Sequence, residues 1–253
     1  MERITSRTNP LMVHLRKLGS SRSYRSKTGE YLGDGTKLLA EVLRWGAELT
    51  AAVCTPGFPL PDLPAGVRTA EVPEELMAYV SPMEAPQGVL FSARRPAAAL
   101  PDRLTGRRYL ALEGVQDPGN VGTVLRTADA FEADGLFLLP GCADPYSPKT
   151  LRASMGAVFR RPVWQCTLEE LEALAEGADL PLLGAALRAD TVDARRADLS
   201  RCVLLIGSEG RGLSSAALAA CHQTVRIPMS PRCESLNAAV AAAVLLWEGW
   251  RNE

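Results

Sequence analysis

The feature that most constrains the fold is the alternation of short apolar segments with helical segments from Tyr109 onward. The strand-like segments are Tyr109–Val115, Gly135–Leu139, Val163–Cys166, Leu182–Leu187, Val203–Ile206 and Val225–Pro228. The helix-like segments are Asn120–Glu132, Lys149–Phe159, Leu168–Ala175, Ser214–Cys221 and Leu236–Trp250. Strands that alternate with helices form a parallel sheet covered on both faces. The sequence therefore predicts an α/β fold with a mostly parallel sheet.

The first 95 residues form a separate compositional unit. The pattern predicts helices over Leu11–Leu18 and Thr36–Trp45 and strands over Glu48–Cys54 and Gln87–Phe91. The stretch from 94 to 106 is rich in Ala, Pro and Arg, which is typical of a linker. We therefore predict a smaller α/β domain over 1–95, a linker over 96–106 and a larger domain over 107–253.

Charge is unevenly distributed along the chain. The formal net charge is -1, but residues 1–30 hold seven basic and two acidic side chains. A basic segment on a near-neutral body favours contacts with the phosphates of a polyanion, and a solvated helix face is the alternative. The candidate phosphate contacts are Arg7, Arg16, Lys17, Arg22 and Arg25.

Composition also excludes several classes of protein. None of the six cysteines has C-x-x-C spacing and there are only two histidines, which argues against a zinc site or a disulfide framework. We expect buried thiols in a reducing compartment, and hence a cytoplasmic protein without a membrane span. Residues 1–27 lack the apolar core of a secretory signal, but they are rich in Arg and Ser, so an organellar transit peptide stays an alternative.

Three junctions between a strand and its following loop are polar and rich in glycine, at the sheet edge where open α/β proteins bind ligands. In the first junction, over 113–126, Asn120 is expected to cap a helix. Arg126 follows six residues later, and it faces the same ligand only if its long side chain reaches back. A helix cap followed by a surface arginine would look the same.

The second junction, over 204–213, has the spacing G-x-x-G-x-G. This is neither the dinucleotide fingerprint nor a phosphate loop, so nicotinamide and triphosphate cofactors are disfavoured. Its Glu209 suits a cation or an arginine. In the third junction, we expect Ser235 to be a helix N-cap. Asn237 would then lie in a buried helix, where an unpaired amide costs about 1–3 kcal/mol, which suggests a ligand or a second subunit as its partner.

In this order and spacing the three junctions resemble the SpoU/TrmH class of SPOUT methyltransferases, which methylate ribose 2′-hydroxyls of RNA. The motifs are Asn120-Val-Gly-x-x-x-Arg126-Thr-Ala-Asp-Ala-Phe131, Ile206-Gly-Ser-Glu-Gly-Arg-Gly-Leu213, and Ile227-Pro-Met with Ser235-Leu-Asn-Ala-Ala-Val-Ala-Ala-Ala-Val-Leu-Leu-Trp-Glu248. The resemblance covers about 109–251. The segments 4–18 and 85–89 are similar to the N-terminal RNA-binding domain of the two-domain members.

The chain departs from that family pattern at two places. Relatives usually read Phe-x-x-Glu-Gly where this chain has Tyr31-Leu-Gly-Asp34-Gly35. The loop Pro231-Arg-Cys-Glu234 stands where relatives more often contain Gly and Val.

The resemblance implies a C-terminal trefoil knot that binds S-adenosylmethionine, with no metal. By motif position, the cofactor-binding residues are Leu187, Gly207, Ile227, Ser235 and Leu236. The residues implied for catalysis are Arg126, which orients the hydroxyl and adjacent phosphate, together with Asn120, Glu209 and Asn237. The family's active site lies at a two-fold interface, which implies a homodimer with the last helix in the contact.

The substrate is less constrained than the class of enzyme. The two-domain resemblance favours large-subunit ribosomal RNA over transfer RNA. Three alternatives stay open at this point: a 2′-O-methyltransferase of transfer RNA, a methyltransferase acting on a base nitrogen, and a non-catalytic RNA-binding factor in ribosome assembly. The residues do not reveal which nucleotide is modified.

Overall fold

The computed structural model describes residues 1–96, 99–189, 191–233 and 235–251. The chain divides into two compact units. Unit 1 comprises Met1–Ala97 and Tyr146–Phe159, and unit 2 comprises Ala98–Pro145 and Arg160–Glu253. No described helix has both the length and the apolar character needed to cross a membrane. The domain boundaries predicted from the sequence stay a prediction.

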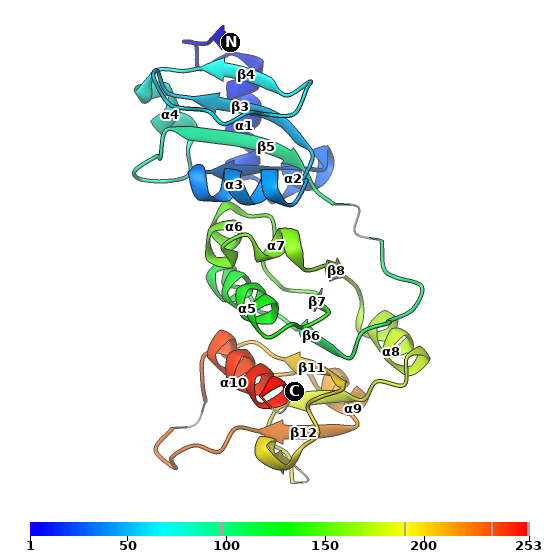
Figure 1. The fold of residues 1–253 in the computed structure, drawn as a ribbon. Coiled ribbons are helices and arrows are strands. Elements are labelled where there is room, and N and C mark those ends of the chain that lie inside the picture. Colours follow the sequence, from blue (N-terminus) through cyan, green and yellow to red (C-terminus); the bar gives the residue numbers. More distant parts are fainter. Residues whose placement is uncertain (97–98, 190, 234, 252–253) are drawn as a thin grey trace. The chain divides into compact units, whose positions relative to one another are not determined.

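Unit 1 is built on a mixed sheet in the order β1-β4-β3-β5-β2 (Figure 1). Its elements are β1 (Glu2–Arg3), α1 (Pro10–Ser20), α2 (Arg22–Thr28), β2 (Glu30–Asp34), α3 (Thr36–Arg44), β3 (Leu49–Cys54), β4 (Arg68–Glu71), α4 (Glu74–Val80) and β5 (Val89–Arg94). Strand β5 runs antiparallel to β2 and β3, whereas β3, β4 and β1 are parallel. Apolar residues of α1 and α4 pack with the sheet in one core, so these two helices cover the same face.

A segment from the middle of the chain completes unit 1. Helices α6 (Pro148–Ser154) and α7 (Ala157–Arg160) follow Tyr146, whose ring stacks on Tyr31 of β2 with centroids 5.5 Å apart. Phe159 stacks on the same ring at 5.9 Å. Tyr31 is fully buried, and burial raises the pKa of its phenol. The departure from the family pattern at this position therefore places a tyrosine inside an aromatic cluster.

Unit 2 contains the parallel sheet predicted from the sequence, in the order β10-β12-β9-β11-β6-β7-β8. Its elements are β6 (Arg108–Leu112), α5 (Pro118–Ala130), β7 (Gly135–Leu138), β8 (Val163–Gln165), α8 (Leu168–Gly177), β9 (Leu182–Ala185), β10 (Val192–Asp193), β11 (Cys202–Ile206), α9 (Ser215–Ala220), β12 (Gln223–Arg226) and α10 (Ala238–Trp250). Every pairing between these strands is parallel, which confirms the predicted fold class.

Helices cover both faces of this sheet because its strands are apolar on both sides. Tyr109 and Ala111 of β6 lie in a core with residues of α8 and α9. Leu110 and Leu112 point to the opposite face by strand alternation and are fully buried. Helices α5 and α10 contact each other and lie side by side in Figure 1. Arg108 links them to the sheet, because its guanidinium donates to the carbonyls of Gly249 and Phe131.

Two predicted helix starts were wrong, and both errors concern the N-cap. Helix α5 begins at Pro118 with Asp117 as its cap, so Asn120 lies inside the first turn. Proline is favoured at the first helical position, where its missing N–H has no partner to lose. Helix α10 begins at Ala238 and is capped by Asn237 instead of Ser235. The predicted helix over 149–159 is two helices, because the chain turns at Met155 and Gly156, both with positive φ.

Candidate active site

The carboxyl ends of β9, β11 and β12 surround a pocket of about 270 Å³. All five residues predicted to bind the cofactor line it: Leu187, Gly207, Ile227, Ser235 and Leu236. They come from three strand ends and the loop before α10, which are separated by up to 49 positions in the chain. Carboxyl ends of parallel strands are where open α/β sheets bind their ligands. Glu234, in the loop that departs from the family pattern, lies outside the described residues.

Gly207 allows the tight loop that forms one wall of the pocket. A Cβ at this position would lie 2.2 Å from the carbonyl carbon of Gly212, a distance that no side chain can occupy. Gly212 has a φ of +66°, and its N–H donates to the carbonyl of Ser208 at 2.8 Å. The glycine spacing of the second motif therefore has a backbone cause: close approach at Gly207 and a left-handed conformation at Gly212.

Helix α10 supplies part of the pocket that the predicted cofactor-binding residues did not include, although these residues lie within the third motif. Ala238, Ala241 and Leu245 line it, at positions i, i+3 and i+7 of one helical face. Their small or apolar side chains bring the helix close to the strand ends. The helical spacing of these residues could have indicated that they line the pocket, but residues that simply pack a helix against the core have the same spacing.

Three residues of the predicted catalytic set form one hydrogen-bonded row. Asn120 donates through its Nδ2 to Oε1 of Glu209, and Asn237 donates through its Nδ2 to Oδ1 of Asn120 at 3.2 Å. Asn237 also accepts from the backbone N–H groups of Ala239 and Val240 at 2.9 and 3.3 Å. Each of the three motifs thus contributes one polar side chain to the row, which lies at the N-terminus of α10.

This geometry corrects the expectation that Asn237 is buried. Its side chain is exposed, and its partners are the first turn of α10 and Asn120. An asparagine at an N-cap satisfies helix N–H groups that would otherwise lack a partner. No ligand is needed to explain why an amide stands at this position.

Arg126 lies on α5, six residues beyond Asn120, and is exposed. Six residues turn the helix by about 240°, so the two side chains leave it in different directions. Within the described part of the chain, no hydrogen bond joins Arg126 to the row formed by Asn120, Glu209 and Asn237. The guanidinium therefore stays available to a molecule that approaches from solvent.

Glu113 makes a hydrogen bond in this region, and the motifs did not assign a role to this residue. It follows β6, and its Oε2 accepts from the backbone N–H of Ser214 at 2.8 Å. Ser214 is the N-cap of α9 and directly follows the second motif. This hydrogen bond joins the end of β6 to the residue that follows the glycine-rich loop after β11. It therefore helps to hold that loop against the neighbouring strand.

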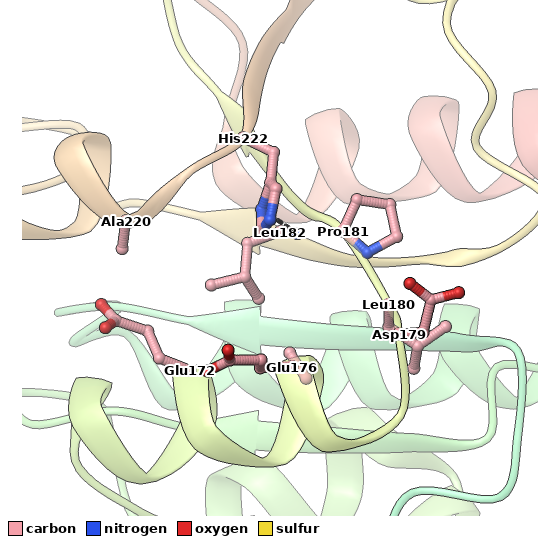
Figure 2. Close-up of a pocket in the computed structure, with 9 residues that line it drawn as sticks. Glu172, Glu176, Asp179, Leu180, Pro181, Leu182, Ala220 and His222 are labelled. Atoms are coloured by element: carbon pink, nitrogen blue, oxygen red, sulfur yellow. Dashed lines mark hydrogen bonds between the residues drawn. The ribbon is translucent and has the colours of Figure 1, made fainter.

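A second pocket of unit 2 lies at the opposite edge of the sheet. Figure 2 shows Glu172 and Glu176 of α8 across from His222, with Pro181 and Leu182 beside them. Leu182 and His222 stand at the amino ends of β9 and β12, and the N–H of Leu182 donates to Nδ1 of His222 at 3.2 Å. Because the predicted site residues gather at the carboxyl ends, this pocket is separate from the candidate active site.

The basic residues predicted to contact RNA divide into two groups. Arg7, Arg16, Lys17 and Arg22 are exposed. The guanidinium carbons of Arg7 and Arg16 lie 4.5 and 3.8 Å from the centre of the Tyr79 ring, so the fold joins two separate segments over one aromatic side chain.

Arg25 corrects that prediction. It is only 4% exposed, and its Nη1 donates to the carbonyl of Leu18 at 2.6 Å. Its guanidinium is committed to joining α2 to α1 inside unit 1, because a buried charge must be hydrogen-bonded to be tolerated. The sequence alone does not distinguish the buried Arg25 from the exposed basic residues near it in the chain.

Comparison with known proteins decides the family. Residues 107–247 match the model of the SpoU rRNA Methylase family, which is more than half of the chain. This chain belongs to the SpoU rRNA methylase family. Residues 9–90 match the MRM3-like substrate binding domain. The resemblance inferred from the three motifs is thereby confirmed.

SpoU-family proteins similar to this chain span both units. The 23S rRNA (guanosine(2553)-2′-O)-methyltransferase RlmP of Bacillus subtilis is 32% identical over 250 residues, which cover 98% of each chain. A crystal structure of AdoMet-bound rRNA methyltransferase from Sinorhizobium meliloti has a TM-score of 0.88 at 31% identity and covers 99% of this chain and 98% of that one.

A second AdoMet complex, of the SpoU methyltransferase AviRb from Streptomyces viridochromogenes, has a TM-score of 0.84 at 30% identity. It covers 96% of this chain and 98% of that chain.

Proposed function

We propose that this SpoU-family chain transfers a methyl group from S-adenosylmethionine to a ribose 2′-hydroxyl of large-subunit, 23S-type ribosomal RNA. The observation that carries the proposal is the convergence of the three motif loops on one pocket, with a polar row of Asn120, Glu209 and Asn237 formed from the same loops. Relatives that extend over both units and are named 23S rRNA 2′-O-methyltransferases support the choice of RNA.

The residues of the pocket fit the methyl donor. Adenine has apolar faces and an edge of donors and acceptors, which suit apolar strand ends that also present backbone groups. Leu187, Ile227 and Leu236 provide the apolar surface, and Gly207 lines the pocket with backbone atoms alone. When bound, S-adenosylmethionine supplies a methyl group on a positively charged sulfur, which an oxygen nucleophile can attack.

We assign Arg126 to the ribose. Arginine is not deprotonated in proteins under ordinary conditions, so it is a poor general base. Its guanidinium is suited to holding the phosphate beside the 2′-hydroxyl and to stabilising negative charge that develops on the oxygen. Asn120 and Glu209 hold each other in place beside the pocket, and Asn237 fixes this pair to the start of α10.

The test is methyl transfer to deproteinised ribosomal RNA with tritiated S-adenosylmethionine. Wild-type protein should label large-subunit RNA, and the label should resist alkaline hydrolysis because a methylated 2′-oxygen cannot attack the phosphate. Arg126→Ala should lower the rate by about 10²–10³, the usual effect of losing a group that stabilises developing charge. Its affinity for S-adenosylmethionine, measured by calorimetry, should stay within about threefold of wild type, since Arg126 does not line the pocket.

Arg103→Ala is the matched control, because Arg103 is an exposed arginine of the same unit outside the pocket. It should behave as wild type. If Arg126→Ala kept most of its activity, the role of this residue would be wrong. Label recovered on a base after digestion to nucleosides would overturn the choice of the ribose oxygen, and labelling of transfer RNA alone would overturn the choice of RNA.

We also propose that the chain works as a homodimer in which α10 contributes to the contact. Helix α10 is apolar on two sides: Ala242 and Leu245 are buried within unit 2, whereas Val240, Val244 and Trp247 are exposed at 48%, 39% and 47%. An apolar stripe on an otherwise buried helix favours burial against another chain. Multi-angle light scattering should give twice the chain mass of 27.1 kDa. A monomer at the concentration of the methylation assay would refute this.

A further inference from the structure

Unit 1 contains a pocket of about 500 Å³ that shares no residue with the methyl-donor pocket. Helix α3 forms one side, α6 contributes Arg152 and its C-cap Met155, and the loop before β5 contributes Met83 and Gln87. Leu38 and Met83 give it apolar walls, and Asp34, at the end of β2, is its buried carboxyl group.

Asp34 has one oxygen with no partner. The residue is 8% exposed, and its Oδ2 accepts from Oγ of Ser81 at 2.5 Å. Its Oδ1 has no hydrogen-bond partner among the described residues. Burial raises the pKa of this carboxyl, although the Ser81 hydrogen bond, the charge of Arg152 and the backbone N–H of Gln87 act to lower it. A buried acceptor without a hydrogen bond destabilises the fold, because it has lost its contact with water and gained nothing in return.

Arg152 contributes a second unpaired group to the same pocket. Its Nη1 is buried and also lacks a hydrogen-bond partner within the described part of the chain. The pocket thus presents one unpaired acceptor and one unpaired donor, on a lining that also holds Lys37, Glu41 and Gln87 beside its apolar side chains. Buried polar groups in folded proteins are normally satisfied, so an unpaired donor and acceptor that share one cavity indicate a ligand that pairs with both.

We propose that this pocket binds a single unpaired base of the RNA, an inference that rests on the proposed function. A nucleobase has apolar faces for Leu38 and Met83 and an edge on which donors and acceptors stand side by side, which matches Asp34 and Arg152. Proteins read RNA mainly through unstacked bases of loops and bulges, which enter such pockets. The volume is in the range of small-ligand sites and admits a base with its ribose. Lys37, exposed on the lining, can meet the phosphate.

Two variants test the pocket, and one alanine provides a matched control. Ala40→Trp fills the pocket from an exposed position of α3, so it should not disturb the core. Asp34→Asn keeps the size of the side chain and removes the charge. Ala78→Trp makes the same substitution as the first variant at an exposed position of α4 that does not line the pocket.

The first measurement is base-specific chemical probing of ribosomal RNA bound to the full-length protein. Wild type should protect the pairing edge of at least one unpaired base, and Ala40→Trp should abolish that protection while Ala78→Trp retains it. The KM for RNA should rise at least tenfold in Ala40→Trp and in Asp34→Asn, with kcat within about twofold, because a contact with a base outside the reacting centre contributes to binding and not to chemistry.

The second measurement distinguishes an RNA base from a free nucleoside. The four nucleosides are titrated separately into protein saturated with S-adenosylhomocysteine, so that the methyl-donor pocket is blocked. Together with the RNA effects above, either result supports the proposal: nucleoside binding that Ala40→Trp abolishes, or no nucleoside binding. Nucleoside binding without the RNA effects would indicate a site for a free nucleoside and would overturn it.

An unchanged footprint and KM in Ala40→Trp would overturn it, whether or not nucleosides bind. Because wild type is assayed for methyl transfer in the same samples, failure of transfer would refute the proposed function, whereas normal transfer with no pocket effect would refute only the base site.

Discussion

Asn237 offers a way to separate the stability of α10 from the chemistry of the site. Its Oδ1 accepts two N–H groups at the start of α10, and its Nδ2 donates to Asn120. Replacing an asparagine N-cap by alanine costs about 1 kcal/mol, and losing one exposed hydrogen bond costs about 0.5–1 kcal/mol more. Asn237→Ala should therefore destabilise unit 2 by about 1.5–2 kcal/mol, which corresponds to a fall in Tm of about 3–8 °C.

Asn237→Asp should behave differently. Aspartate is an equally good N-cap, and its charge is favourable at a helix N-terminus, so the Tm should stay within about 2 °C of wild type. It cannot donate to Oδ1 of Asn120, and two acceptors then face each other, so Asn120 should leave Glu209. We expect methyl transfer to fall at least tenfold in a variant of nearly normal stability.

Thermal unfolding followed by tryptophan fluorescence is the appropriate assay, because three of the four tryptophans, Trp164, Trp247 and Trp250, lie in unit 2. Methyl transfer is measured on the same preparations. If Asn237→Asp were destabilised as much as Asn237→Ala, the cap would not be the source of the stability. If Asn237→Asp kept full activity, the row of polar side chains would have no part in the reaction.

Three further predictions concern single residues. Gly207→Ala should weaken S-adenosylmethionine binding at least tenfold by calorimetry, because its Cβ would meet Gly212 at 2.2 Å; unchanged affinity would contradict the loop geometry. Arg25→Met should lower the free energy of unfolding in urea by about 1–3 kcal/mol, because the buried carbonyl of Leu18 loses its donor, while RNA affinity changes less than twofold. Burial raises the pKa of Asp34 in the folded protein. The protonated carboxyl therefore stabilises the folded state below about pH 4, which is its pKa in the unfolded chain, and this stabilisation is lost as the pH rises through the higher pKa of the folded state. Asp34→Asn should therefore gain stability relative to wild type as pH rises above about 4, and a pH-independent difference would show that Asp34 does not titrate as described.

The N-terminal unit shows where sequence patterns lose information. The pattern indicated α1, α3, β3 and β5, whose apolar residues recur at helical or strand spacing. It missed β1, α2, β2, β4 and α4, which are short segments of two to seven residues with little periodicity. Such segments are held by contacts with distant parts of the chain, as when Tyr31 of β2 stacks on Tyr146.

Helix caps and side-chain burial were the features of the functional residues that the sequence predicted least well. Asn120, Ser235 and Asn237 are all residue types that cap helices well, so their identity does not show which of several adjacent candidates is used. Arg25 has the same charge as Arg22 and differs from it only in the direction in which its side chain leaves α2. Both questions depend on backbone direction, which is set when the helices pack.

The class of fold and the family could be predicted from the amino-acid sequence, because strand–helix alternation and three spaced motifs are local properties of the chain. The resemblance of the motifs also indicated the residues of the methyl-donor pocket, and three of them, Leu187, Gly207 and Ile227, lie just after the carboxyl ends of β9, β11 and β12. The trefoil knot implied by the resemblance stays a prediction. The row formed by Asn120, Glu209 and Asn237, and the cavity shared by Asp34 and Arg152, could be seen only in the folded protein. Such contacts join residues about 90 to 120 positions apart, and their geometry depends on packing that no local pattern records.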